Sequence, residues 1–473
     1  MKPLMSMHSK IRRHSFRWIA AYVCLLVSLN QAFPQTPSIP ENQELLNGLK
    51  ILFWPKPGSA EVLVKLRIHS GSAFDLAGKA GEMALLGDVM FPDPATIDYF
   101  SEQMGGKLNV SVNYDSMTIT MVGKAEQLDN IMEVLRNAIL ATQLTPEVVN
   151  RVRETRIKLV RDTAVSPSIV ADRAIALRLF GDFPYGRPSA GLPEDLARIE
   201  RGDLMLARER FLNSNNATLV IAGGVDRAKA MRTLKQLFGP WRKTEQIAPS
   251  TFQEAKAPDP RTLLVNVPSS TVEIRLAWRG VARPDPDFYV AQVVAQVAQD
   301  RWRETSPELA SKPLFVKSES YVLPGIVIMG NAVNQKETVD SLATAKKVAE
   351  SFMNTPVTAA EVQRARQEIL SEENPGLSKI EAEPDRWLDM DTYGLKSVQD
   401  RAASIQAVSP GDVQRVATRL FKDTPVATVV VGDAQQLKQL LQGHMQFEVL
   451  GEMPAKIPTT KPPTKPGTTT SPS

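Results

Sequence analysis

Side chains that could bind a metal ion or act as a nucleophile are scarce in this sequence of 473 residues. The chain has a single cysteine and four histidines. Zinc sites on helices use two histidines three or four residues apart, because that spacing puts both imidazoles on one face. No two histidines here have that spacing, so the sequence contains no helical histidine pair that would hold zinc. The residues concerned are Cys24, His8, His14, His69 and His444.

Two carboxylates, Glu82 and Asp88, lie in a predicted helix over residues 78–91. Six residues along a helix leave two side chains about 120° away from a shared face. We therefore favour solvated or helix-capping roles for them over a carboxylate metal site. His69 ends a predicted strand on its polar face, where a lone histidine is more often hydrogen-bonded than a metal ligand.

The N-terminal segment has the pattern of a secretory signal. Four cations between Lys10 and Arg17 precede an apolar stretch over residues 18–29. That stretch is shorter than the roughly 20 residues that cross a bilayer. We predict that residues 1–32 are a signal peptide and that the protein is exported to the periplasm or cell envelope, with an uncleaved N-terminal anchor as the alternative. Because Cys24 lies in this segment, the mature chain would have no thiol for a disulfide, a metal site or catalysis.

The charge and the C-terminus set further limits. The formal net charge of +4 includes the cations of the predicted signal, and without them the chain carries about −1. This balance gives no basic footprint for nucleic acid. Residues 453–473 are rich in proline and threonine and nearly free of apolar side chains. We predict a disordered tail there, either a solvated end or a spacer.

Alternating apolar residues and turn residues predict strands and helices along the chain. In residues 61–69, apolar side chains alternate with Lys65, Arg67 and His69, a pattern typical of a strand with one buried face. In the first half, the predicted strands cover residues 49–54, 61–69, 108–113, 116–122 and 217–222. The predicted helices cover residues 78–91, 95–104, 126–140, 146–160, 169–180 and 203–211.

The second half repeats the first at an offset of about 210 residues. Residues 271–278 correspond to the strand near residue 61, residues 358–366 to 145–153, and residues 427–432 to 217–222. The repeat predicts an α+β fold of two homologous duplicated domains, each a mostly antiparallel sheet with helices packed on one face. The predicted domains are residues 33–245 and 260–452, joined by a linker over residues 246–259.

Several stretches occur in an order and spacing that resemble one known family. They are NGLKILFWPKP from Asn47, GKA from Gly78, FPYGRPSAGLPEDL from Phe183, NATLVIAGGVD from Asn216 and RGVARPDPDFY from Arg279. Over residues 45–440 the chain resembles the pitrilysin/insulinase family of zinc metallopeptidases, which includes the mitochondrial processing peptidase subunits.

The resemblance implies a zinc cofactor that this chain has no residues to bind. Active members carry H-x-x-E-H on the helix that corresponds to residues 78–91, with two histidine ligands and a glutamate that activates water. Those positions fall on Gly81, Ala84 and Leu85, and the third ligand falls near Leu159. None of these side chains binds metal or accepts a proton, so no catalytic or metal residue is predicted.

The resemblance also implies where peptides would bind. Asn109, Val110 and Ser111 occupy the place of the edge strand to which extended peptides add by main-chain hydrogen bonds, although an ordinary sheet strand is the alternative. Arg301, Arg303 and Phe315 correspond loosely to substrate contacts from the second domain. An exposed helix face explains the two arginines equally well.

Three functions remain open, in the order that we favour them. The first is a non-catalytic, peptidase-like subunit that pairs with a homologous active zinc peptidase. The second is a stand-alone periplasmic protein that binds extended peptides or acts as a scaffold. The third is an active metallopeptidase with a rebuilt site.

Overall fold

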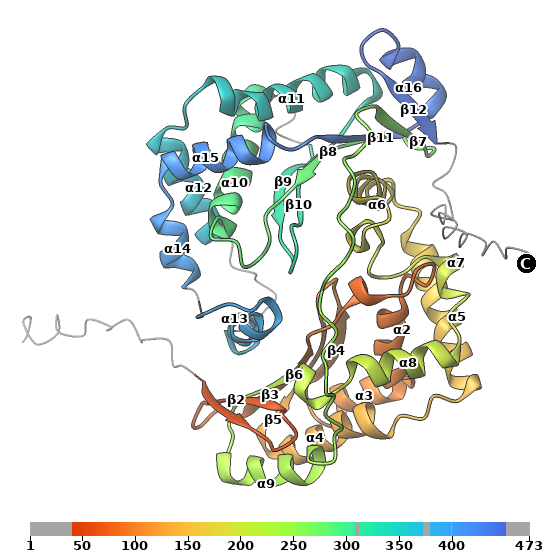
Figure 1. The fold of residues 1–473 in the computed structure, drawn as a ribbon, viewed down its shortest axis with the longest axis vertical. Helices are drawn as coiled ribbons and strands as arrows, with labels where there is room; N and C mark the ends of the chain where they lie inside the picture. Colours follow the sequence, from red (N-terminus) through yellow and green to blue (C-terminus); the bar gives the residue numbers. More distant parts are fainter. Residues whose placement is uncertain (1–39, 308–311, 372–378, 399, 451–473) are drawn as a thin grey trace, which may run out of the picture. The chain divides into compact units, whose positions relative to one another are not determined.

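The computed structural model describes residues 40–307, 312–371, 379–398 and 400–450 (Figure 1). The predicted signal peptide and the predicted tail lie outside these residues. Within the described ranges, no helix is both long enough and apolar enough to cross a membrane.

The first half of the chain forms a six-stranded mixed sheet in the order β1-β2-β6-β3-β5-β4. β2 and β6 pair in parallel, and β6, β3, β5 and β4 pair antiparallel. The predicted strands and the β4–β5 hairpin are confirmed. The strands are β1 (Glu41–Glu44), β2 (Lys50–Pro55), β3 (Glu61–Ile68), β4 (Lys107–Val112), β5 (Met117–Lys124) and β6 (Ala217–Gly223).

Most helices of the first half pack around one apolar core on a single face of this sheet (Figure 1). The predicted helix over residues 126–140 is divided into α4 and a π-helical turn, Asn137–Ala141. The helices are α2 (Glu82–Met90), α3 (Pro94–Glu102), α4 (Leu128–Arg136), α5 (Pro146–Thr163), α6 (Pro167–Phe180), α7 (Pro193–Leu196), α8 (Arg201–Phe211) and α9 (Arg227–Phe238).

The second half forms another six-stranded sheet, in the order β12-β7-β11-β8-β10-β9. Five strands follow the same order as in the first sheet, which confirms the duplication. The strands are β7 (Thr262–Asn266), β8 (Val272–Arg279), β9 (Leu314–Glu319), β10 (Ile326–Val333), β11 (Ala427–Gly432) and β12 (Phe447–Leu450). The helices are α10 (Phe288–Thr305), α11 (Thr338–Asn354), α12 (Ala359–Ser371), α13 (Lys379–Tyr393), α14 (Arg401–Ala407), α15 (Pro410–Phe421) and α16 (Ala434–Leu441).

The two halves exchange one helix each. α6 belongs to the first half but packs on β7, β8 and β11 of the second sheet (Figure 1). α13 belongs to the second half but packs on β3 and β6 of the first sheet. The predicted α+β duplicated fold is confirmed, and the exchanged helices cover the second face of each sheet, where the sequence pattern predicted no cover.

The covered face corrects the expectation for β3. Its polar side was predicted to be exposed, but Lys65 and Arg67 are only 5% and 8% exposed. The reason is that α13 lies across them and pairs with both cations. Alternation along the strand is preserved, but neither face meets bulk solvent.

Candidate functional site

α2, the helix that the resemblance aligns with the family's catalytic helix, begins at Glu82, later than predicted. Gly78 and Gly81 have φ values of +75° and +97°, which are left-handed and end any helical continuation toward the N-terminus. The carboxylate of Asp75 accepts hydrogen bonds from the backbone N–H groups of Gly81 at 2.7 Å and Met83 at 2.9 Å. Burial raises the pKa of Asp75 to about 7, although these bonds favour its ionised form.

Gly81 packs directly against the backbone of the segment that precedes α7. A Cβ atom at Gly81 would lie 2.7 Å from the Cα of Gly191 and 2.8 Å from Cδ2 of Leu196. A Cβ atom at Gly191, where φ is +96°, would lie 2.8 Å from the carbonyl oxygen of Ala80. Contacts this short do not occur in proteins, so both positions require glycine and no side chain fits at position 81.

The other positions of the expected zinc site are also unsuited to metal. Ala84 and Leu85 are 3% and 0% exposed and belong to the apolar face of α2. Leu159 lies on α5 and is 57% exposed. Among the described residues, no group of three or more histidine, cysteine, aspartate or glutamate side chains is placed to hold a metal. The residues present therefore do not fit the zinc ion that the family would imply.

The two carboxylates of the helix have structural partners. Glu82 is 3% exposed and accepts a hydrogen bond from the backbone N–H of Leu76 at 3.1 Å. Asp88 forms an ion pair with Arg156 of α5, with Nη2 and Oδ1 3.2 Å apart. Glu82 closes the turn before α2 and Asp88 joins two helices, so the two side chains point to separate partners.

A polar groove lies along β4, on the face of the first sheet that α13 covers. β4 is the last strand of this sheet and pairs with β5. The side chain of Val110 faces the helices, where its Cγ1 lies against Gly87. Asn109 and Ser111 face the other way and line a cavity of about 430 Å³. The remaining lining residues are Lys65, Arg67, Lys107, Asn113, Thr118, Thr120, Glu381 and Asp385.

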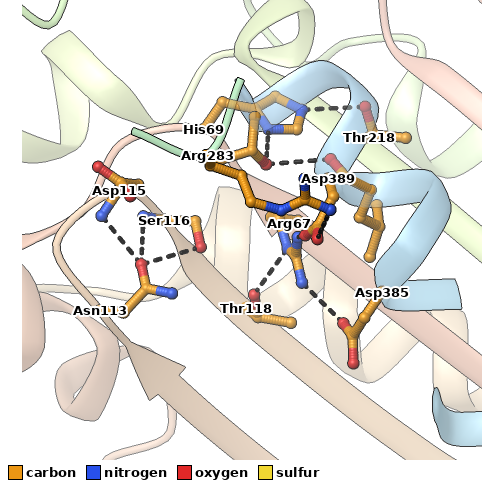
Figure 2. A network of polar contacts seen from close by, with 12 residues as sticks. Arg67, His69, Asn113, Asp115, Ser116, Thr118, Thr218, Arg283, Asp385 and Asp389 are labelled. Atoms are coloured by element: carbon orange, nitrogen blue, oxygen red, sulfur yellow. Dashed lines mark hydrogen bonds and ion pairs between the residues drawn. The ribbon is translucent and has the colours of Figure 1, made fainter. Parts of the chain in front are cut away.

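The back wall of this groove is a network of ion pairs between β3 and α13. Figure 2 shows Arg67 extended toward α13, where it pairs with Asp385 and Asp389, each at 2.7 Å. Its Nε donates to the hydroxyl of Thr118 at 3.2 Å. Lys65 completes the network with a 2.7 Å pair to Asp385. The strand cations are therefore neutralised by the second half of the chain.

The network has a counterpart in the second sheet. Arg275 of β8 is 1% exposed and pairs through Nε with Asp172 of α6 at 2.6 Å. In the internal repeat, α6 corresponds to α13 and β8 to β3. Each exchanged helix is therefore fastened by an acidic side chain to a cation on the sheet of the other half.

His69 is held at the same interface as a hydrogen-bonded side chain. Its Nδ1 lies 2.9 Å from the hydroxyl of Thr392, and its Nε2 lies 3.0 Å from that of Thr218 (Figure 2). Thr218 in turn donates to Asp391 at 2.8 Å. Removal of the imidazole from water lowers the pKa of His69 to about 4, against the opposing effect of Asp391. The ring is neutral near pH 7 and joins a strand to α13.

A second contact between the halves surrounds the β4–β5 turn. Asn113 accepts from the backbone N–H groups of Asp115 and Ser116, which fixes the turn (Figure 2). The carboxylate of Asp115 accepts from the N–H of Val322 at 3.0 Å and from the hydroxyl of Tyr185 at 3.3 Å. Burial raises the pKa of Asp115 to about 6.

The three candidates from the second half do not line the groove. Arg301 is 9% exposed, pairs with Glu361 at 2.7 Å and lies 4.4 Å above the ring of Phe352. These contacts give Arg301 a packing role among α10, α11 and α12. Arg303 is exposed on α10, and Phe315 is half-buried on β9, the last strand of the second sheet.

Several residues of the site were not singled out from the sequence. They are the acidic side chains of α13 and the cations that they meet on β3. The available signal was the four-residue spacing of Asp385 and Asp389, which puts both on one helix face. That spacing does not say which strand the face would cover.

Comparison with known proteins places the chain in one family. Residues 50–190 match the family described as insulinase (peptidase family M16), and residues 198–369 match the peptidase M16 inactive domain. Together these matches cover about two thirds of the chain. The protein therefore belongs to the M16 peptidase family, as its resemblance indicated.

Individual relatives are distant. The chain is 23% identical over 421 residues to the mitochondrial-processing peptidase subunit beta of Dictyostelium discoideum, covering 82% of this chain and 87% of that protein. It is 21% identical over 218 residues to an uncharacterized zinc protease of Rickettsia felis, covering 45% of this chain and 52% of the relative. The chain thus matches about half the length of the rickettsial protein.

Solved structures show the same fold. A peptidase M16 inactive domain from Pseudomonas fluorescens superposes with a TM-score of 0.72 at 17% identity, covering 84% of this chain and 98% of that one. A protease from Helicobacter pylori gives a TM-score of 0.72 at 18% identity, with 83% and 100% covered. At these identities the likeness establishes the fold alone.

Proposed function

We propose that this protein is an exported, non-catalytic M16 homologue that pairs with an active zinc peptidase of the same family. The observation that carries the proposal is the packing of Gly81 against Gly191. The first histidine of an H-x-x-E-H motif would have to stand where the backbone of another segment already lies. Zinc-dependent hydrolysis needs ligands and a base at these positions, and this chain offers glycine, alanine and leucine.

The pairing is supported by the parts that the chain retains. Both duplicated sheets, the exchanged helices and the groove along β4 are intact. The relative from Dictyostelium is by name a subunit of a processing peptidase. A chain that keeps the fold and the groove without the metal ligands can complete a substrate chamber whose chemistry is supplied by another subunit.

The role of the groove follows from its chemistry. An extended peptide that adds to β4 would form main-chain hydrogen bonds and place alternate side chains toward Asn109 and Ser111. Those bonds require no particular side chain, so peptide binding does not depend on the catalytic residues. The chain would hold substrate while its partner cleaves it.

Co-expression with an H-x-x-E-H homologue from the same genome tests this proposal. We expect a one-to-one complex in size-exclusion chromatography with light scattering, one zinc per complex, and peptide cleavage that a chelator abolishes. The protein alone is expected to bind no stoichiometric zinc and to cleave nothing. Stoichiometric zinc and chelator-sensitive cleavage by the purified protein alone would overturn the proposal.

A second candidate function is a stand-alone peptide-binding protein. It is favoured by the position of the groove at the end of the sheet, where a peptide can add without a second subunit. A monomer that binds an unfolded peptide with micromolar affinity, and that does not associate with its homologue, would favour this function over the first.

A further inference from the structure

A large cavity lies away from the β4 groove. Its volume is about 970 Å³, at the upper end of the range for ligand and peptide sites. Three parts of the chain form it: the segment before α2, the end of α6 with the turn that follows, and residues 252–259 between the two halves. Leu263, Glu448 and Leu450 close the side that belongs to the second sheet.

Four phenylalanines line this cavity: Phe74, Phe180, Phe183 and Phe252. Phe252 comes from the segment between the halves and lies 5.6 Å from the ring of Phe74 and 6.1 Å from that of Phe183, measured between centroids. Both pairs are close to edge-on, at 62° and 85°. Grooves lined by aromatic rings are the sites in which proline-rich segments in the polyproline II conformation dock.

The charged side chains that line the cavity do not favour a ligand of either sign. Arg178 at the cavity is already paired with Asp259 at 3.3 Å and with Glu448. Other lining side chains carry both signs, for example Glu254 and Lys256. The apolar and aromatic wall must therefore carry most of the contact with whatever binds there.

The chain has a proline-rich segment that begins close to this aromatic-lined cavity. β12 ends at Leu450, which lines the cavity, and the sequence continues as a proline-rich stretch from Pro454 to Pro463. The four residues from Leu450 to Pro454 can span up to roughly 13 Å. Ten residues in the polyproline II conformation extend for about 31 Å. The stretch is thus long enough and close enough to cross the cavity without rearrangement of β12.

We propose that residues 454–463 dock in this cavity, between Phe252 and the rings of Phe74 and Phe183. The docked segment would contact the first half, the segment between the halves and the second sheet at once. It would fasten residues 252–259 to both halves. This inference is independent of the proposed pairing with an active peptidase.

Limited trypsin digestion of the full chain tests the docking. Lys461 and Lys465 precede prolines, so Lys456 is the cleavable lysine of the segment. We expect Phe252→Ala to speed cleavage after Lys456 at least ten-fold relative to the wild-type protein. Leu159→Ala, which removes an exposed apolar side chain elsewhere, is the matched control and should leave the rate unchanged. Equal rates in the wild-type protein and Phe252→Ala would overturn the proposal.

A double-mutant cycle, measured as changes in Tm, separates docking from a simple loss of stability. Truncation after residue 452 is expected to lower Tm by several degrees in the wild-type background and by much less in the Phe252→Ala background. Equal shifts in both backgrounds would show that the tail and Phe252 act independently and would also overturn the proposal.

Native mass spectrometry of the full chain tests for another occupant. A small molecule that is bound in the cavity, and that Phe252→Ala displaces, would likewise overturn the proposal.

Discussion

The Cα of Gly191 lies 2.7 Å from the position where a side chain at residue 81 would begin. Gly81 stands at the start of α2, where the family resemblance aligns it with the first histidine of H-x-x-E-H, and Gly191 belongs to the segment before α7. Because each residue has a left-handed φ and each faces the backbone of the other, the two glycines exclude any larger residue. The packing at residue 81 thus agrees with the absence of an H-x-x-E-H motif from the sequence.

We predict that Gly81→Ala destabilises the fold by about 2 to 4 kcal/mol, from the left-handed conformation and the overlap with Gly191. Gly58→Ala is the matched control, because Gly58 has a φ of +83° and no atom lies within 4 Å of the point that its Cβ would occupy. It should cost only the conformational part, about 1 kcal/mol. Urea denaturation of both variants measures the difference, and equal costs would contradict the packing argument.

Restoration of the motif is expected to fail. The triple variant Gly81→His, Ala84→Glu and Leu85→His should bind no stoichiometric zinc and should be less stable than Gly81→Ala alone, since a larger side chain meets the same backbone. Metal analysis of the purified variant together with its urea midpoint gives the answer. A folded variant with one tightly bound zinc would show that the segment around Gly191 moves aside at little cost.

The ion pairs of Arg67 are expected to hold α13 on the first sheet. Arg67→Ala removes the shared partner of Asp385 and Asp389, but these carboxylates are 39% and 24% exposed and keep Lys65 and Arg283 as partners, so we expect a loss of about 1 to 2 kcal/mol. Lys158→Ala removes a fully exposed pair with Asp162 and should leave the stability unchanged. Hydrogen exchange should show faster exchange of α13 in the first variant alone. Unchanged protection of α13 would mean that Trp387 and Leu388 suffice to hold it.

His69 makes the stability depend on pH in a defined direction. Its pKa is lowered to about 4 in the folded protein from about 6.5, so the folded state binds fewer protons than the unfolded state between these values. The stabilisation is fully present above pH 6.5 and is lost as the pH falls toward 4. From pH 7 to pH 5 the wild-type protein should lose about 2 kcal/mol relative to His69→Gln. A difference that stays constant with pH would contradict this assignment.

Asp115 should act with the opposite sign. Burial raises its folded pKa to about 6 from 3.8, so the folded state holds a proton more tightly between these values. Its contribution is fully present below pH 4 and is lost as the pH rises through 6. The wild-type protein should therefore gain about 1 kcal/mol relative to Asp115→Asn when the pH is lowered from 7 to 5. Denaturation curves of both proteins at the two pH values measure this gain.

Peptide binding at β4 can be blocked without disturbing the fold. Ser111→Trp should fill the groove and weaken binding of an extended peptide at least ten-fold, because Ser111 is exposed and faces the cavity. Asn130→Trp, on the exposed side of α4, is the matched control and should bind as the wild-type protein does. Fluorescence anisotropy with a labelled unfolded peptide measures both. Equal binding by the two variants would place the peptide elsewhere.

Residue types, spacing and periodicity determined much of this protein by themselves. The small number of histidines and the spacing between them ruled out a helical zinc pair, and the offset of about 210 residues predicted two homologous domains. Strand and helix patterns were readable because each depends on residues two to four positions apart, as in the alternation along β3. The strand over residues 108–113 was readable for the same reason, whereas the edge position of Asn109, Val110 and Ser111 was implied by the family resemblance.

Only the tertiary structure decided what covers those elements. The exchange of α6 and α13 buries the polar face of β3 and builds the groove wall from residues more than 300 positions apart, such as Lys65 and Asp385. The contact of Gly81 with Gly191 joins two turns that carry no periodic pattern. Packing between distant segments depends on shape and charge in three dimensions, which local spacing does not encode. The sequence therefore contains no H-x-x-E-H motif, and the structure shows that Gly81, which the family resemblance aligns with the first histidine, has no space for a side chain.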